Sequence, residues 1–145
     1  MKKILLLISL LLLCGCSAKR EEYFILSFDG NETAVGYDRV EDIEYIEGID
    51  SYDFYLNRDE EAIVKRIVIY PDDLNDRQII LDGRPLPEKI SEACKDFKGS
   101  YSDEMGHSCV ISKDVKGTKT YAIFYGDILA DDSDVLDRIE VYFDK

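Results

Sequence analysis

The chain lacks tryptophan, has a single histidine and three prolines, and has no long hydrophobic run after its first sixteen residues. Because a membrane-spanning helix needs about 20 consecutive apolar residues, no second membrane segment is expected. Linkers rich in proline, glycine or serine and low-complexity runs are also lacking. A chain of this length without a linker is expected to fold as one domain around one core.

Basic residues are in the minority, with 18 lysines and arginines against 31 aspartates and glutamates and a net charge of −13. Proteins that bind nucleic acid need a basic surface to neutralise phosphates. The composition therefore argues against a nucleic-acid partner. It favours solubility and repulsion from anionic surfaces.

Catalytic residue patterns are equally scarce. The only histidine, His107, precedes Ser108 in a predicted loop. A hydrolase triad needs a nucleophile, a base and an acid that converge, and the G-x-S-x-G elbow is lacking. Neighbours on a strand also point to opposite faces. The sequence predicts no catalytic residue and no enzyme.

Two acidic clusters, at residues 71–76 and 130–137, are candidates for calcium loops. Neither has the glycine at position 6 and the glutamate at position 12 of an EF-hand loop. One histidine and two cysteines outside the N-terminal segment are also too few for a typical zinc site. We interpret the clusters as solvated turns and predict no metal and no cofactor.

The N-terminus has the three parts of a secretory signal peptide: Lys2 and Lys3, an apolar stretch at 4–13, and a short cysteine-bearing end. That end, Leu13-Cys14-Gly15-Cys16, resembles the bacterial lipobox. The resemblance implies a diacylglycerol thioether on Cys16, cleavage before it, and acylation of the new amine. Cys14 does not match because bulky Leu13 precedes it. The alternative is an ordinary signal peptide with incidental cysteines.

The lipobox resemblance implies three segments: a signal peptide at 1–15, a lipidated tether at 16–22 and an extracytoplasmic domain at 23–145. Two or three acyl chains would anchor the protein stably in a lipid bilayer. Lys19 and Arg20 in the tether are expected to favour anionic headgroups. The expected location is the outer face of the plasma membrane or the outer membrane. Cleavage would remove two lysines and leave a net charge of −15.

One amphipathic helix is predicted at residues 87–98. Ile90, Ala93, Cys94 and Phe97 fall on one face of a 3.6-residue repeat. Pro87 suits the first turn, and Gly99 suits a left-handed stop. Cys94 then points inward, where Cys109 of a predicted strand at 108–112 can meet it. We expect a disulfide, which closes a loop of about 15 residues; the alternative is two free buried thiols.

Most of the remaining chain alternates between apolar and polar residues, which is typical of β-strands. The predicted strands lie at 23–28, 63–70, 78–81, 108–112, 120–125 and 138–143, and turn signals such as Asp82-Gly83 and Lys116-Gly117 follow several of them. Residues 38–47 fit either a short helix or a strand. The predicted fold class is α+β, an antiparallel sheet with at least one packed helix.

Two pairs of segments echo one another: RIVIYPD at 66–72 with RIEVYFD at 138–144, and ILSFDG at 25–30 with QIILDG at 78–83. They suggest a duplicated unit of strand, variable or helical segment and hairpin. The alternative is that hairpins in an acidic, tyrosine-rich chain look alike by chance. The stretch LDGRPLPEKISEACKDFKG at 81–99 is also similar to the β-lactamase-inhibitor-protein-like fold of small envelope lipoproteins, which implies a helix followed by antiparallel strands.

Ten tyrosines are the one feature that points towards binding. Tyrosine is common at recognition surfaces, although half-buried strands favour it as well. We take Tyr52, Tyr55 and Tyr125 as a candidate contact surface for an envelope protein or glycan. The expected function is a non-enzymatic, membrane-anchored binding or accessory module. The alternative is an envelope enzyme or ligand-capture protein with a site built from scattered carboxylates.

Overall fold

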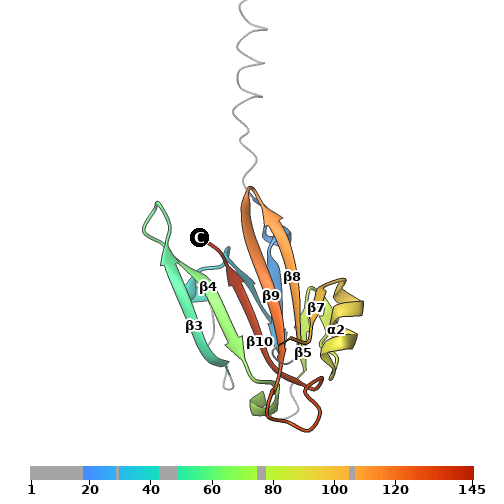
Figure 1. The fold of residues 1–145 in the computed structure, drawn as a ribbon. Coiled ribbons are helices and arrows are strands. Elements are labelled where there is room, and N and C mark those ends of the chain that lie inside the picture. Colours follow the sequence, from blue (N-terminus) through green and yellow to red (C-terminus); the bar gives the residue numbers. More distant parts are fainter. Residues whose placement is uncertain (1–17, 29, 43–48, 75–77, 105–106) are drawn as a thin grey trace, which may run out of the picture.

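The computed structural model describes residues 18–28, 30–42, 49–74, 78–104 and 107–145 (Figure 1). The larger sheet has six antiparallel strands in the order β3-β4-β10-β9-β8-β7. Their bounds are β3 Ile49–Leu56, β4 Ala62–Ile69, β7 Ser100–Ser102, β8 Ser108–Val115, β9 Thr118–Gly126 and β10 Leu136–Phe143. The last strand of the chain therefore lies inside the sheet.

A second, four-stranded antiparallel sheet has the order β2-β1-β5-β6. Its strands are β1 Phe24–Phe28, β2 Asn31–Val35, β5 Ile79–Leu81 and β6 Arg84–Pro85. The helix α2 spans Ile90–Phe97, and three 3-10 turns lie at η1 Arg20–Glu22, η2 Val40–Asp42 and η3 Pro71–Leu74. Among the described residues the fold is thus mainly antiparallel β with one packed helix, as predicted for the α+β class.

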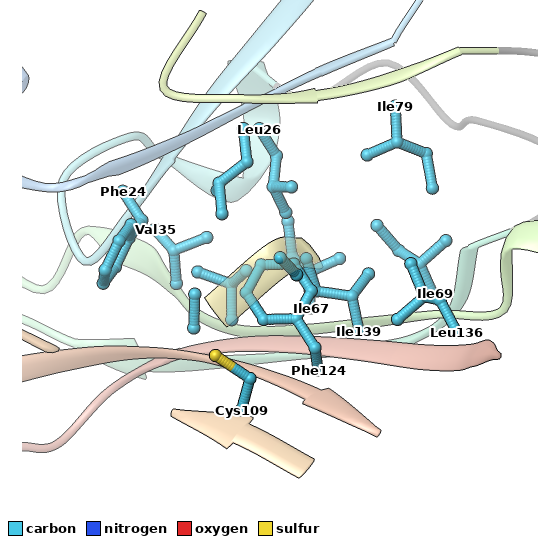
Figure 2. Close-up of a cluster of buried hydrophobic side chains, with 14 of the residues drawn as sticks. Phe24, Leu26, Val35, Ile67, Ile69, Ile79, Cys109, Phe124, Leu136 and Ile139 are labelled. Carbon is cyan, nitrogen blue, oxygen red and sulfur yellow. The ribbon is translucent and has the colours of Figure 1, made fainter. Parts of the chain in front are cut away.

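The core lies between the two sheets (Figure 2). Phe24, Leu26 and Phe28 of β1 project at alternate positions towards side chains of the larger sheet, such as Phe124 and Ile139, and all five are buried. Burial of such side chains stabilises a fold by about 1.5–3 kcal/mol each. Helix α2 extends the inner layer, with Ile90, Ala93 and Cys94 in the same cluster.

The helix begins later than predicted. Residues 87–89 are not helical, because Lys89 has extended backbone and forms a β-bridge with Val135. Asp134 then satisfies the first turn: its carbonyl accepts from Ile90 N at 2.8 Å, and its carboxylate accepts from Ser91 N at 2.9 Å and Ser91 Oγ at 2.6 Å. A cap supplied from 43 residues away sets the start of the helix.

The end of the helix is where it was predicted, but for a different reason. Lys98, and not Gly99, takes the left-handed conformation, with φ of 56°. Gly99 is needed for space, because a Cβ there would lie 2.5 Å from Cys109 Sγ. The glycine allows the chain to pass directly over the disulfide.

Two predicted turns are confirmed. Asp82-Gly83 and Lys116-Gly117 both have positive φ at both residues, as tight hairpins require. Within the ambiguous segment 38–47, residues 40–42 form η2 and residues 43–47 lie outside the described part of the chain. Strand β3 was not predicted, because register shifts against β4, one of them between Asp53 and Phe54, break its alternation.

The echoing segments are neighbours in the fold. β4 pairs with β10, which places Ile67 opposite Val141 and Ile69 opposite Ile139. β1 pairs with β5 in the other sheet. The pair β4-β10 lies at the centre of the four consecutive strands β3-β4-β10-β9. The pair β1-β5 lies in the same way at the centre of β2-β1-β5-β6.

Across the residues with described positions, no helix is long and apolar enough to cross a membrane.

Candidate functional site

The predicted disulfide is present between Cys94 and Cys109. It joins the inner face of α2 to β8, and the sulfur of Cys109 points into the core (Figure 2). Both residues are buried. This bond fixes the helix over one end of the larger sheet. Cys16, the predicted lipidation site, lies outside the described residues.

The larger sheet is covered on one side only. The four-stranded sheet and α2 pack against its inner side, and no element of the described chain lies over the outer side (Figure 1). We call this outer side the open face. It is built from alternate residues of the central strands: Arg66, Val110, Tyr121, Ile123, Tyr125, Arg138, Glu140 and Tyr142.

Aromatic and charged groups on the open face are paired with one another. The rings of Tyr121 and Tyr142 stack with centroids 4.9 Å apart, and the Arg138 guanidinium lies 4.2 Å from the centre of the Tyr125 ring. Arg66 Nε donates to Glu140 Oε1 at 2.6 Å. These contacts hold half-buried side chains in fixed positions, which lowers the entropy lost when a partner binds.

Burial is the main cause that raises the pKa of Tyr125, with help from the Glu140 carboxylate, and it also raises the pKa of Tyr142. A phenolic hydroxyl can both donate and accept a hydrogen bond. A surface of this kind is typical of protein or glycan recognition.

A pocket of about 610 Å³ lies where the open face meets the start of the loop between β9 and β10. Tyr125 and Arg138 belong to the open face, and His107, Asp127 and Asp137 complete much of the wall. The pKa of Asp137 is raised, first by burial and then by the nearby Asp127 carboxylate. The pocket thus holds partly uncompensated negative charge beside one arginine.

His107 has a structural neighbour and no triad geometry. Its Nδ1 lies 3.5 Å from Asp134 Oδ1, the carboxylate that caps α2. Its ring also packs against Tyr101, with centroids 5.4 Å apart. The acid that would orient a catalytic histidine is already bonded to Ser91.

Of the three tyrosines predicted as one contact surface, two lie on or beside the open face. Tyr125 belongs to the open face, and Tyr52 is exposed on the edge strand β3, where it borders a groove shared with Arg66, Glu140 and Tyr142. Tyr55 is half-buried: its ring stacks on Phe143 and its hydroxyl donates to Gly36 O at 3.4 Å. Tyr55 therefore packs inside the fold and is not part of a contact surface.

Tyr121, Ile123 and Tyr142 were not predicted as site residues. A signal for them existed, because residues 121, 123 and 125 alternate with buried Ala122 and Phe124. The acidic clusters do not form a metal site in the described part of the chain, where no group of three or more metal-binding side chains converges. Asn75 and Asp76 of the first cluster lie outside that part.

The segment predicted as a free tether is partly folded against the domain. Arg20 donates to the Asp38 carboxylate from Nε at 3.0 Å and from Nη2 at 2.9 Å, and Ala18 packs beside the buried cluster that includes Tyr23 and Phe143. Arg20 is thus held in an ion pair with Asp38, with about 33% of its side chain exposed. Its contact with lipid headgroups stays a prediction.

Comparison of the chain with protein-family models, with curated proteins and with solved structures gave no match in any of the three.

Proposed function

We propose that this protein is a lipid-anchored, extracytoplasmic binding module that contacts a macromolecule of the cell envelope through its open face. The observation that carries the proposal is a sheet face of tyrosine, isoleucine and paired charges that no described element covers. Large uncovered surfaces with apolar content usually mark interaction sites. The pre-formed pairs Tyr121–Tyr142 and Tyr125–Arg138 supply rigid aromatic contacts.

Anchoring at Cys16 is supported by the lipobox pattern and agrees with the docking of the residues that follow it. Arg20 and Ala18 are held against the domain, so only Ser17 separates Cys16 from the packed chain. One residue spans at most about 3.6 Å. A lipidated Cys16 would then hold the domain directly on the membrane surface, with little freedom to move away from it.

The anchor is tested with Cys16→Ser in the native host, followed by fractionation and intact mass. We expect loss of the acyl mass and either release from the membrane or accumulation of unprocessed precursor. Cys14→Ser is the matched control and should leave processing unchanged. Normal membrane retention of processed Cys16→Ser protein would overturn the anchor.

The open face is tested by replacing Ile123 with a photo-crosslinking amino acid in the full-length membrane protein. We expect a discrete crosslinked species from Ile123. Glu92, exposed on the outer side of α2, is the control position and should give none. Equal crosslinking from both positions, or none from Ile123, would contradict the assignment of this face.

A second candidate function, capture of a small ligand, is supported by the pocket beside Asp127 and Asp137. A carboxyl with a raised pKa next to a second carboxylate is a feature of sites that bind cations or transfer protons. Isothermal titration with small amines tests it. Heat that disappears in Asp137→Asn but not in Asp73→Asn would favour this candidate over the first.

We also propose that the fold arose by duplication of a strand-and-hairpin unit. Support comes from the central pairing of the echoing strands, β1 with β5 and β4 with β10. On this proposal α2, β7 and β8 are an insertion in the second copy, because the first half has no counterpart for them among its described elements. Internal symmetry of this kind appears in the sequence as repeated segments.

A further inference from the structure

Strand β3 forms one edge of the six-stranded sheet and exposes three large apolar side chains. Tyr52, Phe54 and Leu56 expose 47%, 56% and 62% of their surfaces. Natural edge strands are commonly short, charged or covered, because a long apolar edge recruits other strands. β3 has eight residues, and in Figure 1 no described element lies beyond it.

The opposite edge of the same sheet, strand β7, is protected against further strand pairing. β7 has only three residues, Ser-Tyr-Ser, and α2 lies against it. β3 has no such cover: the backbone hydrogen bonds described for it are the ladder to β4. Its outward-facing amide and carbonyl groups are thus available for a further strand.

β3 is continuous with the open face. A groove of about 480 Å³ is lined by Tyr52 and Phe54 of β3 together with Arg66, Glu140 and Tyr142 of the open face. A strand added beside β3 would place alternate side chains along this groove, because side chains in a sheet alternate between its two faces. The edge and the face therefore form one surface.

The charge of the chain selects the kind of strand that fits. The net charge of −13 disfavours a second copy, since two such chains repel each other. Asp53, in the middle of β3, keeps an exposed carboxylate 3.4 Å from Arg66 and would face its own copy in a symmetric pairing about that position. A basic partner avoids both costs.

We propose that β3 accepts an extended segment of a partner polypeptide, apolar at alternate positions and basic between them, as a seventh strand of the sheet. Backbone hydrogen bonds would supply the affinity, and Tyr52, Phe54 and Leu56 the selectivity. The inference rests on the proposed function, because it specifies how the partner of the open face is held.

The test uses the full-length protein in detergent micelles and, as probe, an eight-residue peptide of alternating valine and lysine, matched in length to β3. Hydrogen exchange by mass spectrometry should show about tenfold slower exchange in β3 and no change in α2, as expected for edge amides that become bonded. A probe methylated on alternate amides cannot complete the ladder, and a probe with glutamate for lysine has the wrong charge. Neither should protect β3.

Phe54→Asn is expected to weaken probe binding about tenfold, a loss of 1.4 kcal/mol. Tyr101→Asn, at the exposed aromatic of the opposite edge, is the matched control and should bind as the wild type does. Equal protection by the methylated probe, or equal loss in both variants, would overturn strand addition. A wild-type dimer that Phe54→Asn dissociates would also overturn the proposal, because a second copy of the chain would then occupy the edge of β3.

The two proposals fail separately. Crosslinking from Ile123 without probe binding at β3 would support the open face as a contact surface and contradict strand addition at β3. Protection of β3 by the probe without crosslinking from Ile123 would support strand addition and contradict the open face as a contact surface.

Discussion

Arg20 and Asp38 are joined through two nitrogens of the guanidinium, and the same carboxylate accepts from Ala34 N at 2.7 Å. This single side chain thus ties the segment after the predicted anchor to the turn that follows β2. The hydrogen bond to Asp38 raises the pKa of Arg20. The relationship ties Arg20, which the sequence assigned to the tether at 16–22, to the folded domain.

Asp38→Ala should destabilise the protein by about 2 kcal/mol, because it leaves the buried Ala34 amide without an acceptor and leaves the Arg20 guanidinium with Glu32 alone. Arg20→Ala removes a more exposed group and should cost about 1 kcal/mol or less. Urea unfolding measures both values. Trypsin should also cleave after Lys19 faster in Asp38→Ala than in the wild type; equal cleavage rates would show that the pair does not hold the segment.

Reduction of the Cys94–Cys109 disulfide should lower the unfolding free energy by about 3 kcal/mol, the value expected for a closed loop of this size. The separation of 15 residues sets that loop. Denaturant curves with and without reductant give the difference, and intact mass under non-reducing conditions should be two hydrogens lower. Cys94→Ala/Cys109→Ala should reproduce the reduced protein, with no further response to reductant.

Lys98 and Gly99 should respond oppositely to substitution. Lys98→Gly relieves a left-handed backbone and should stabilise the fold by about 1 kcal/mol. Gly99→Ala places a methyl group against Cys109 Sγ and Val110 O and should destabilise it by about 1–3 kcal/mol. Thermal unfolding of the two single variants is the measurement. A stabilising Gly99→Ala would contradict the packing described for this position.

The cap on α2 should make stability depend on pH. Burial opposes ionisation of Asp134, but the hydrogen bonds from Ser91 and the nearby His107 and Lys89 outweigh it, so its pKa is lowered in the fold. The contribution of Asp134 to the free energy of unfolding is therefore complete above the unfolded carboxyl pKa of about 3.9. It is lost as the pH falls through the lower pKa of the folded state.

Asp134→Asn removes that titration while keeping the shape of the side chain. The difference in unfolding free energy between wild type and Asp134→Asn should be about 1 kcal/mol at pH 5 and should shrink below about pH 4. Asp131→Asn, in the same loop and exposed, is the control and should show a smaller pH dependence. A difference that persists unchanged at pH 2 would exclude Asp134 as an ionised cap.

Local patterns predicted the parts of the fold that depend on local physics. Ile90, Ala93 and Cys94 are buried together because their spacing puts them on one helical face, and Lys116-Gly117 turns because both residues adopt positive φ. The helix start was wrong because its cap, Asp134, comes from a distant loop. Local periodicity carries no information about such a partner.

The candidate site was predictable only in part. The alternation in β10 placed Arg138, Glu140 and Tyr142 on the side opposite Ile139 and Val141, which is correct. Which side stays uncovered depends on where the four-stranded sheet packs, and that is set by contacts between residues far apart in the chain. For the same reason Tyr55 could not be separated from Tyr125 before the packing of Phe143 was seen.

The position of β10 has a consequence for how the molecule assembles. β10 follows all the other described strands in sequence, yet it fills the gap between β4 and β9 inside the sheet. A chain that lacks β10 would leave two open edges and an uncovered core, so the sheet can close only after β10 has been added. Long-range closure of this kind is slow, and it makes β10 a condition for stability.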